Sequence, residues 1–175
     1  MSEITTSARR PTRKCEEGKL ADLAEHNSLR LALVCSHGGH LSEMQMLWPA
    51  FEGHDLVLIT YDCNRTQALA QEKYLLPNIG TNVWRMARTF FAAWSILKRE
   101  WPDAVLSTGS EIAIPFLWVA KLLGMRTVYV ESWCRVRSRS GTGPLVYPVA
   151  DLFLVQWPEL LERYGPKARY EGGVI

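Results

Sequence analysis

The sequence predicts an α/β domain built on a doubly wound parallel sheet, and two observations support this prediction. From Leu29 onward, short aliphatic runs of strand length alternate with segments of helical length. Each run is predominantly apolar and ends in a polar or small residue, which is typical of parallel strands covered by helices on both faces. In a sheet of this kind, ligands bind beyond the carboxyl ends of the strands.

The expected elements follow from these runs in chain order. The strands are expected at residues 29–35, 55–61, 103–109, 126–132 and 151–156. The helices are expected at residues 41–51, 66–73 and 82–101. Pro49 and Gly53 end the first helix, because proline and glycine interrupt helical structure. Ser110 is expected to cap a further helix whose first turn carries Glu111.

Length and composition favour a single soluble domain over residues 29–175, preceded by a flexible basic tail over residues 1–28. The chain has 175 residues, 47% of them hydrophobic, and a net charge of only +2, which gives no general attraction to nucleic acid. The four cysteines show no paired spacing, and no secretory signal precedes them, so a reducing compartment is expected. The longest apolar stretch, residues 112–124, contains Lys121 and is too short to cross a bilayer. The basic residues of the tail are Arg9, Arg10, Arg13 and Lys14.

Polar loops follow four of the predicted strands and are expected to meet on one rim of the sheet. They cover residues 36–40, 62–66, 107–111 and 131–143. Because the carboxyl ends of parallel strands lie at the same edge, this convergence predicts a ligand site more strongly than any one loop does.

The first loop, S-H-G-G-H over residues 36–40, has the composition of an anion-binding turn. Gly38 and Gly39 would let the backbone approach a phosphate, and the helix that follows would offer its positive end. His40 could then act as a general base or donate to a phosphate oxygen. A glycine turn with a capping histidine explains the same residues equally well. Cys35 and His37 lack a second ligand pair at metal spacing, so neither a metal nor a cofactor is expected.

The remaining polar loops carry charged residues that admit two interpretations. Gly109, Ser110 and Glu111 fit an ordinary helix start, and only their expected place beside the first loop makes them site candidates. Glu131 ends a strand and precedes an arginine-rich segment that could bind a diphosphate or a lipid head group, or could be a solvated loop. The arginines of this segment are Arg135, Arg137 and Arg139.

The predicted helix over residues 82–101 combines an apolar stripe with aromatic and basic residues. Met86, Phe90, Ala93 and Leu97 recur at helical spacing, which packing against the sheet would explain. The aromatic and cationic residues around this stripe also fit a helix lying in a membrane interface. The expected membrane contacts are Arg85, Arg88, Phe90, Phe91 and Trp94.

Four segments give the chain a family resemblance. They are "SHGGHLSEM", "DAVLSTGSEIAIP", "RTVYVES" and the terminal "GGVI". These segments resemble the acceptor-side subunit of the split UDP-N-acetylglucosamine transferase of the dolichol pathway, and equally the PssD-type proteins of bacterial exopolysaccharide synthesis. Both groups are similar to the N-terminal half of MurG-type glycosyltransferases. The resemblance covers residues 29–175 and implies a single Rossmann-like lobe of the GT-B fold.

What the resemblance implies for function is half of an enzyme. Such a subunit binds a lipid-diphosphate-linked sugar at the cytoplasmic face of a membrane, while a separate glycosyltransferase subunit binds the UDP-sugar. Carried over by position, His40 and Glu131 are the expected catalytic residues, and Glu43 and Met44 match the helix that follows the first loop. The expected diphosphate-binding residues are Ser36, His37, Gly38, Gly39, Thr108, Gly109, Ser110, Glu111 and Arg135.

The sequence departs from the family pattern in two respects, and two alternative functions fit it as well. His37 stands where a small residue is usual and Ser36 replaces a glycine. The eukaryotic subunit has an N-terminal membrane-spanning helix that this sequence lacks, which favours a bacterial inner membrane over the endoplasmic reticulum. A non-catalytic membrane scaffold for the catalytic partner is the main alternative, and a stand-alone nucleotide-binding enzyme is another.

Overall fold

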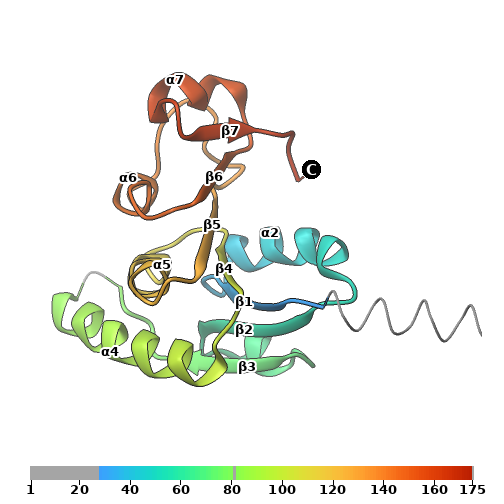
Figure 1. Ribbon diagram of the computed structural model, residues 1–175, viewed down its shortest axis with the longest axis vertical. Coiled ribbons are helices and arrows are strands. Elements are labelled where there is room, and N and C mark those ends of the chain that lie inside the picture. Colours follow the sequence, from blue (N-terminus) through green and yellow to red (C-terminus); the bar gives the residue numbers. More distant parts are fainter. Residues whose placement is uncertain (1–27, 81, 175) are drawn as a thin grey trace, which may run out of the picture.

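The computed structural model describes residues 28–80 and 82–174, so the expected tail lies, except for Ser28, outside the described residues. Within them the chain forms a seven-stranded sheet with helices on both faces (Figure 1). The strands are β1 (Arg30–Val34), β2 (Asp55–Tyr61), β3 (Glu72–Leu76), β4 (Ala104–Ser107), β5 (Arg126–Val130), β6 (Leu152–Val155) and β7 (Ala168–Tyr170). The helices are α2 (Gly39–Leu47), α3 (Asn64–Gln67), α4 (Val83–Glu100), α5 (Ala113–Leu122), α6 (Gly143–Val146) and α7 (Leu161–Tyr164), with short 3₁₀ helices at Trp48–Phe51 and Pro158–Leu160.

The sheet is parallel throughout, in the order β3-β2-β1-β4-β5-β6-β7. The chain first builds outward from β1 to β3 and then crosses back to place β4 on the other side of β1. The point where the direction reverses lies between β1 and β4, and a crevice at the carboxyl ends of such strands is the usual ligand site of open α/β sheets. The predicted doubly wound fold is confirmed.

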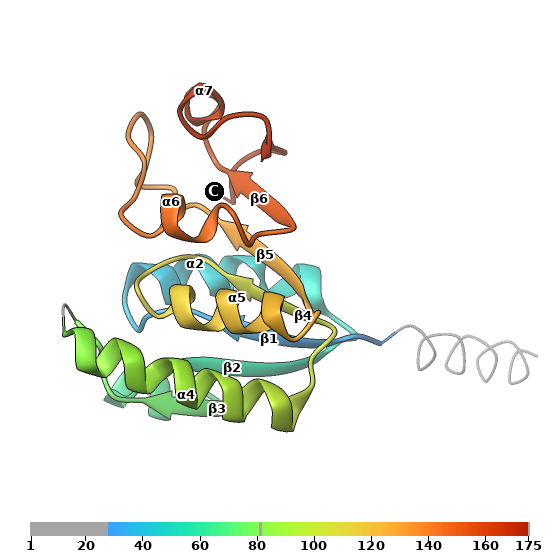
Figure 2. The same ribbon diagram turned by 60° about the vertical axis from the view of Figure 1, so that its left-hand side comes forward.

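Two apolar clusters hold the layers together, one on each face of the sheet. Alternate residues of β1 point to opposite faces, as the two-residue period of a strand requires. Ala32 and Val34 belong to the larger cluster under α4 and α5, whereas Leu31 and Leu33 join Met44 of α2 in the smaller one. Figure 2 shows α4 and α5 side by side along the same face. Both faces of the central strands are therefore covered, which explains their uninterrupted apolar sequences.

The edge strands depart from the sequence-based expectation. The helix expected at residues 66–73 is wrong beyond its first two residues, because α3 ends at Gln67 and β3 starts at Glu72. Glu72 and Lys73 give β3 a polar start that does not look like a buried strand, and an edge strand tolerates such residues. Strand β7 has only three residues and was not anticipated.

The helix after β4 also starts differently from the prediction. Helix α5 begins at Ala113, and no side chain caps its N-terminus. Ser110 instead adopts a left-handed backbone with φ of 72°, and its hydroxyl donates to the carboxylate of Glu111. The expected capping role of Ser110 is therefore wrong.

At the amino-terminal rim of the sheet, Arg30 forms the centre of a charged cluster. Its guanidinium contacts Asp55 of β2 and Glu100 at the end of α4, and its backbone N–H donates to Asp103 at 2.8 Å. The carboxylate of Glu100 also accepts the hydroxyl of Tyr74. These contacts tie strands β1, β2 and β3 to helix α4, at the rim opposite to the predicted ligand loops.

Candidate active site

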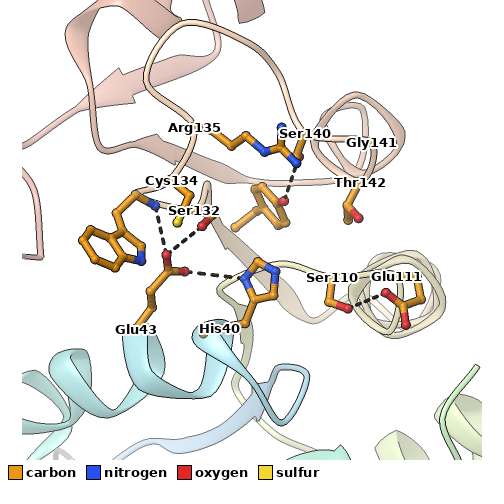
Figure 3. Close-up of a pocket in the computed structure, with 13 residues that line it drawn as sticks. His40, Glu43, Ser110, Glu111, Ser132, Cys134, Arg135, Ser140, Gly141 and Thr142 are labelled. Atoms are coloured by element: carbon orange, nitrogen blue, oxygen red, sulfur yellow. Dashed lines mark hydrogen bonds and ion pairs between the residues drawn. The ribbon is translucent and has the colours of Figure 1, made fainter. Parts of the chain in front are cut away.

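A cavity of about 490 Å³ lies at the carboxyl ends of β1, β4 and β5, where the sheet reverses its direction (Figure 3). Three of the four predicted loops meet there. Of the residues predicted as site residues, it is lined by Gly39, His40, Ser110, Glu111 and Arg135. The loop at residues 62–66 contributes no lining residue. The convergence expected from the strand ends is thus found at the reversal point.

His40 occupies the second position of α2 and is fixed by the strand-end loop of β4. Its Nδ1 lies 2.8 Å from the carbonyl oxygen of Thr108, and the Thr108 hydroxyl donates back to the His40 carbonyl at 2.8 Å. Because a carbonyl oxygen can only accept, Nδ1 carries the hydrogen, and the neutral ring presents the lone pair of Nε2. The side chain is 30% exposed and lines the cavity. A general base needs this arrangement, with one nitrogen held and the other free.

Glu43 lies one helical turn after His40, and its side chain is only 2% exposed. Its Oε1 accepts from the hydroxyl of Ser132 at 2.7 Å and from the backbone N–H of Trp133 at 3.0 Å. Its Oε2 lies 3.5 Å from Nδ1 of His40 (Figure 3). Burial lowers the pKa of His40, but the nearby negative charge of Glu43 and the hydrogen bond to the Thr108 carbonyl outweigh it and bring the pKa above the usual 6.5.

Glu111 brings a second carboxylate to the cavity. Its Oε1 accepts the hydroxyl of Tyr61 at 2.8 Å, and its Oε2 accepts that of Ser110. Burial raises the pKa of Glu111, but the hydrogen bonds from Ser110, its own backbone and Tyr61 outweigh it, so the pKa lies below the usual value. The cavity therefore has an ionised carboxylate at one end. Among the described residues, Glu111 has no lysine or arginine partner.

Glu131 does not line the cavity but lies fully buried behind its wall. Its Oε2 accepts the hydroxyl of Ser140 at 2.8 Å and also that of Tyr164, and its Oε1 accepts the Ser132 N–H at 2.9 Å. Burial, followed by the hydrogen bond to Glu131, raises the pKa of Tyr164, so this phenol stays a donor. Because no cavity surface belongs to Glu131, its position fits support of the 132–142 loop rather than the catalytic role expected from sequence.

The other predicted site residues are divided between the cavity and its surroundings. Ser36 and His37 follow β1 but do not line the cavity, and His37 packs edge-on against Tyr61 with ring centroids 5.9 Å apart. Thr108 and Gly109 are buried against His40 and are not among the lining residues. Gly38 is exposed and is not among the lining residues.

The two loop glycines leave open space in front of the helix that begins at Gly39. A Cβ atom added to Gly38 or Gly39 would meet no atom within 4 Å. The first N–H groups of α2 have no partner within the helix, and the positive end of its dipole faces this space. Anion binding remains a prediction for this loop.

Several cavity residues were not identified from the sequence. They lie in the 132–142 loop or beside it and include Tyr129, Ser132, Trp133, Cys134, Ser140, Gly141 and Thr142. Arg135 was the one residue of this loop assigned to the site, and it is exposed. The basic spacing of the arginines could be read from sequence, whereas the fold of the loop could not. Among the described residues, no cluster of histidine, cysteine and carboxylate side chains could hold a metal ion.

The residues predicted to contact a membrane lie on two different faces of helix α4. Phe90 is partly buried and packs with Met86 against the core, which sets it apart from the exposed face of the helix. Phe91 is 79% exposed and Trp84 is 82% exposed, while Trp94 is partly exposed with the Lys98 ammonium 5.2 Å from its ring centre. Arg85 and Arg88 are exposed and line a hollow of about 340 Å³ beside residues 76–78. Among the described segments, no helix is both long enough and apolar enough to span a bilayer.

Comparison with protein families gives a match to the model described as "Oligosaccharide biosynthesis protein Alg14 like" over residues 75–174. The human protein named UDP-N-acetylglucosamine transferase subunit ALG14 is 27% identical, over 88% of this chain and 87% of its own length. The Schizosaccharomyces pombe protein of the same name is 30% identical, over 81% of each chain. Both relatives are eukaryotic, and they give no support to the expected bacterial inner membrane.

Solved structures with similar folds include two proteins of low sequence identity. MurG from Acinetobacter baumannii superposes with a TM-score of 0.69 at 17% identity, covering 83% of this chain and 45% of MurG. UDP-GlcNAc 2-epimerase from Methanocaldococcus jannaschii gives a TM-score of 0.62 at 16% identity, covering 83% of this chain and 46% of the epimerase. The chain thus spans less than half the length of either protein, and the similarity supports the GT-B relationship of the fold.

Proposed function

The chain belongs to the Alg14-like family of oligosaccharide biosynthesis proteins, and from this premise we propose that it is the acceptor-binding subunit of a two-protein glycosyltransferase. The relatives are named as subunits of a UDP-N-acetylglucosamine transferase. In the proposed reaction, a hydroxyl of a lipid-diphosphate-linked sugar attacks the anomeric carbon of a UDP-sugar held by a separate subunit. The bond to UDP breaks, and the hydroxyl proton moves to this chain.

The observation that carries the proposal is the state of His40 in the cavity. Its Nδ1–H is committed to the Thr108 carbonyl, so Nε2 is available to take the proton of the attacking hydroxyl. The cavity lies at the point of reversal of the sheet, and its volume suits a sugar ring with part of a diphosphate.

The charges of the cavity support one orientation of the acceptor within it. Glu111 is a poor neighbour for a diphosphate, because two anionic groups repel each other, although the resemblance assigns it to diphosphate binding. A carboxylate accepts hydrogen bonds well, so we place sugar hydroxyls at Glu111 and Ser110. The diphosphate then lies toward Arg135 and the first turn of α2, where cationic and N–H groups can bind it.

The exposed face of α4 supports contact with a membrane carrying the lipid acceptor. Trp84, Phe91 and Trp94 would enter the interface, and Arg88 and Lys98 would lie at the level of anionic head groups. This set replaces the one expected from sequence, since Phe90 points to the core and Trp84 joins the exposed face.

A transfer assay tests the proposal directly. Radiolabelled UDP-N-acetylglucosamine is supplied to membranes with this chain alone, with its donor-binding subunit alone, and with both, and label in the lipid fraction is counted. We expect transfer only with both proteins, and a fall of roughly 10²- to 10⁴-fold for His40→Ala, the usual contribution of a general base. Wild-type turnover by a folded, partner-bound His40→Ala protein would contradict catalysis by this subunit and leave the scaffold alternative.

A further inference from the structure

Glu43 is an unusual residue because it is a carboxylate buried on the inner face of a helix without a lysine or arginine partner among the described residues. Buried carboxylates are rarely left without full hydrogen bonding. Both available donors, the Ser132 hydroxyl and the Trp133 N–H, go to Oε1. Its Oε2 is buried and accepts no hydrogen bond.

The unpartnered oxygen faces the candidate base. Oε2 of Glu43 and Nδ1 of His40 are 3.5 Å apart, while the Thr108 carbonyl at 2.8 Å holds the Nδ1 hydrogen. This places a negative charge in the cavity wall beside the Nδ1 edge of the imidazole (Figure 3). An arrangement with a carboxylate behind a histidine is suited to stabilise the charged ring after it takes a proton.

Other charged groups also surround His40, and they differ from Glu43 in position. Glu131, at the end of β5, and Glu111, in the cavity lining, both interact with His40 through their charges. Arg135 lines the same cavity and contributes the opposite charge. Among these groups, Glu43 is the one within ion-pair distance of the imidazole.

We propose that Glu43 is a positioning residue, which orients His40 with Nε2 toward the acceptor hydroxyl and stabilises the imidazolium formed during transfer. This inference rests on the proposed function, in which His40 takes the proton. The proton stays on Nε2, and Glu43 remains a carboxylate throughout the step.

The same carboxylate also links the base to the loop that closes the cavity. Ser132 and Trp133, which donate to Oε1, directly precede Cys134 and Arg135 in the cavity wall. A shift of this loop would therefore move Glu43, and with it the ring of His40. The position of the base is in this way tied to the segment proposed to bind the diphosphate.

The first test measures His40 itself, without substrate or partner. The imidazole resonances of the full chain are titrated by NMR, and His40 is assigned from the signal lost in His40→Asn. In Glu43→Gln, which keeps an acceptor for Ser132 and Trp133 but removes the charge, we expect the His40 pKa to fall. Glu52→Gln, a change at an exposed carboxylate, should leave it unaltered. An unchanged His40 pKa in folded Glu43→Gln protein overturns the proposal.

The second test uses the assembled enzyme and its pH profile. The His40 pKa above 6.5 should set the acidic limb of the transfer rate, because only the neutral ring accepts a proton. In Glu43→Gln this limb should move to lower pH, and the plateau rate should fall on the order of tenfold or more as the charged ring loses its support. A merely structural role would lower the rate without moving the limb.

A second substitution keeps the proposal testable if Glu43→Gln does not fold. If circular dichroism finds Glu43→Gln unfolded, Glu43→Asp keeps the charge and withdraws it from the ring by one methylene group. A smaller fall of the His40 pKa is then expected, and no fall contradicts the proposal. Should His40→Ala retain full transfer while Glu43→Gln shifts the His40 pKa, the proposed function fails but the coupling of Glu43 to His40 stands.

Discussion

The imidazole of His40 lies against the backbone of Gly109, so closely that a Cβ atom at Gly109 would come within 2.8 Å of Cε1 of the ring. Gly109 also has a φ of +119°, a backbone conformation that residues other than glycine rarely adopt. Two features therefore require glycine at this position: the positive φ of the backbone and the close approach of the His40 ring.

Gly109→Ala should displace His40 and reduce sugar transfer by about tenfold to a hundredfold, since a misplacement of about 1 Å can cost that much. Gly124→Ala is the matched control, because Gly124 also has a positive φ but open space around it. Both variants should lose roughly 1 kcal/mol or more of unfolding free energy through backbone strain. An equal loss of transfer in both would mean that the contact with His40 is unimportant.

Glu111→Gln distinguishes a sugar subsite from a diphosphate subsite at this end of the cavity. If sugar hydroxyls donate to the carboxylate, kcat/KM for the acceptor should fall about tenfold or more, the value of a hydrogen bond to a charged group. If the diphosphate lay there, removing the negative charge would raise kcat/KM instead. Glu171→Gln, an exposed change away from the cavity, controls for net charge.

Gly143→Ala should destabilise the protein through the buried network behind the cavity. The added Cβ would lie 2.1 Å from the Tyr164 hydroxyl oxygen and 2.7 Å from Oε2 of Glu131. Overpacking of this kind costs about 1–3 kcal/mol, which urea unfolding can measure. Gly141→Ala, where the Cβ would meet no atom within 4 Å, should unfold at the wild-type urea concentration. Equal midpoints for the two variants would show that the network yields without cost.

Replacing Trp84, Phe91 and Trp94 together by serine should release the protein from vesicles that contain anionic lipid. These side chains are exposed, so the melting temperature should stay near that of the wild type. Phe90→Ser, by contrast, should lower the melting temperature, because Phe90 packs against the core. Vesicle flotation and thermal unfolding measure the two effects, and unaltered binding by the triple variant would exclude this face from membrane contact.

Acid should weaken the cluster around Arg30. The hydrogen bond from the Tyr74 hydroxyl has the largest effect on the pKa of Glu100, and it lowers this pKa. Burial opposes this effect, and the hydrogen bond from Arg30 lowers the pKa further. A carboxyl group with a lowered pKa stabilises the folded state above its unfolded pKa of 4.5 and loses this contribution as the pH falls through the folded value. Tyr74→Phe should therefore show a smaller loss of unfolding free energy than the wild type below about pH 4.5. An identical loss would contradict a role for this hydroxyl.

The strands inside the sheet could be predicted from sequence because helices cover both of their faces. The predicted strands at residues 126–132 and 151–156, for example, differ from β5 and β6 by at most two residues at either end. Strands β3 and β7 lie at the edges, where fewer neighbours demand apolar side chains, so their sequences carry a weaker signal.

The site was predictable as a location but not as a set of contacts. Parallel strand ends must meet at one rim, so His40 and Glu111 could be brought together from topology alone. The direction of the Glu131 side chain depends on Tyr164 and Ser140, which no sequence pattern near Glu131 reveals. Glu43 was overlooked as a cavity residue for the same reason, because its partners Ser132 and Trp133 are about ninety positions away.

The cluster around Arg30 gives this protein a division between its two rims. The cluster of Arg30, Asp55 and Glu100 stabilises the amino-terminal rim of the sheet. None of these three residues lines the cavity at the carboxyl rim. Loops at the carboxyl rim can thus be exchanged, lengthened or redesigned without disturbing the ion pairs of the amino-terminal rim. Such a scaffold is well suited to laboratory evolution, because changes that alter the cavity leave this source of stability intact.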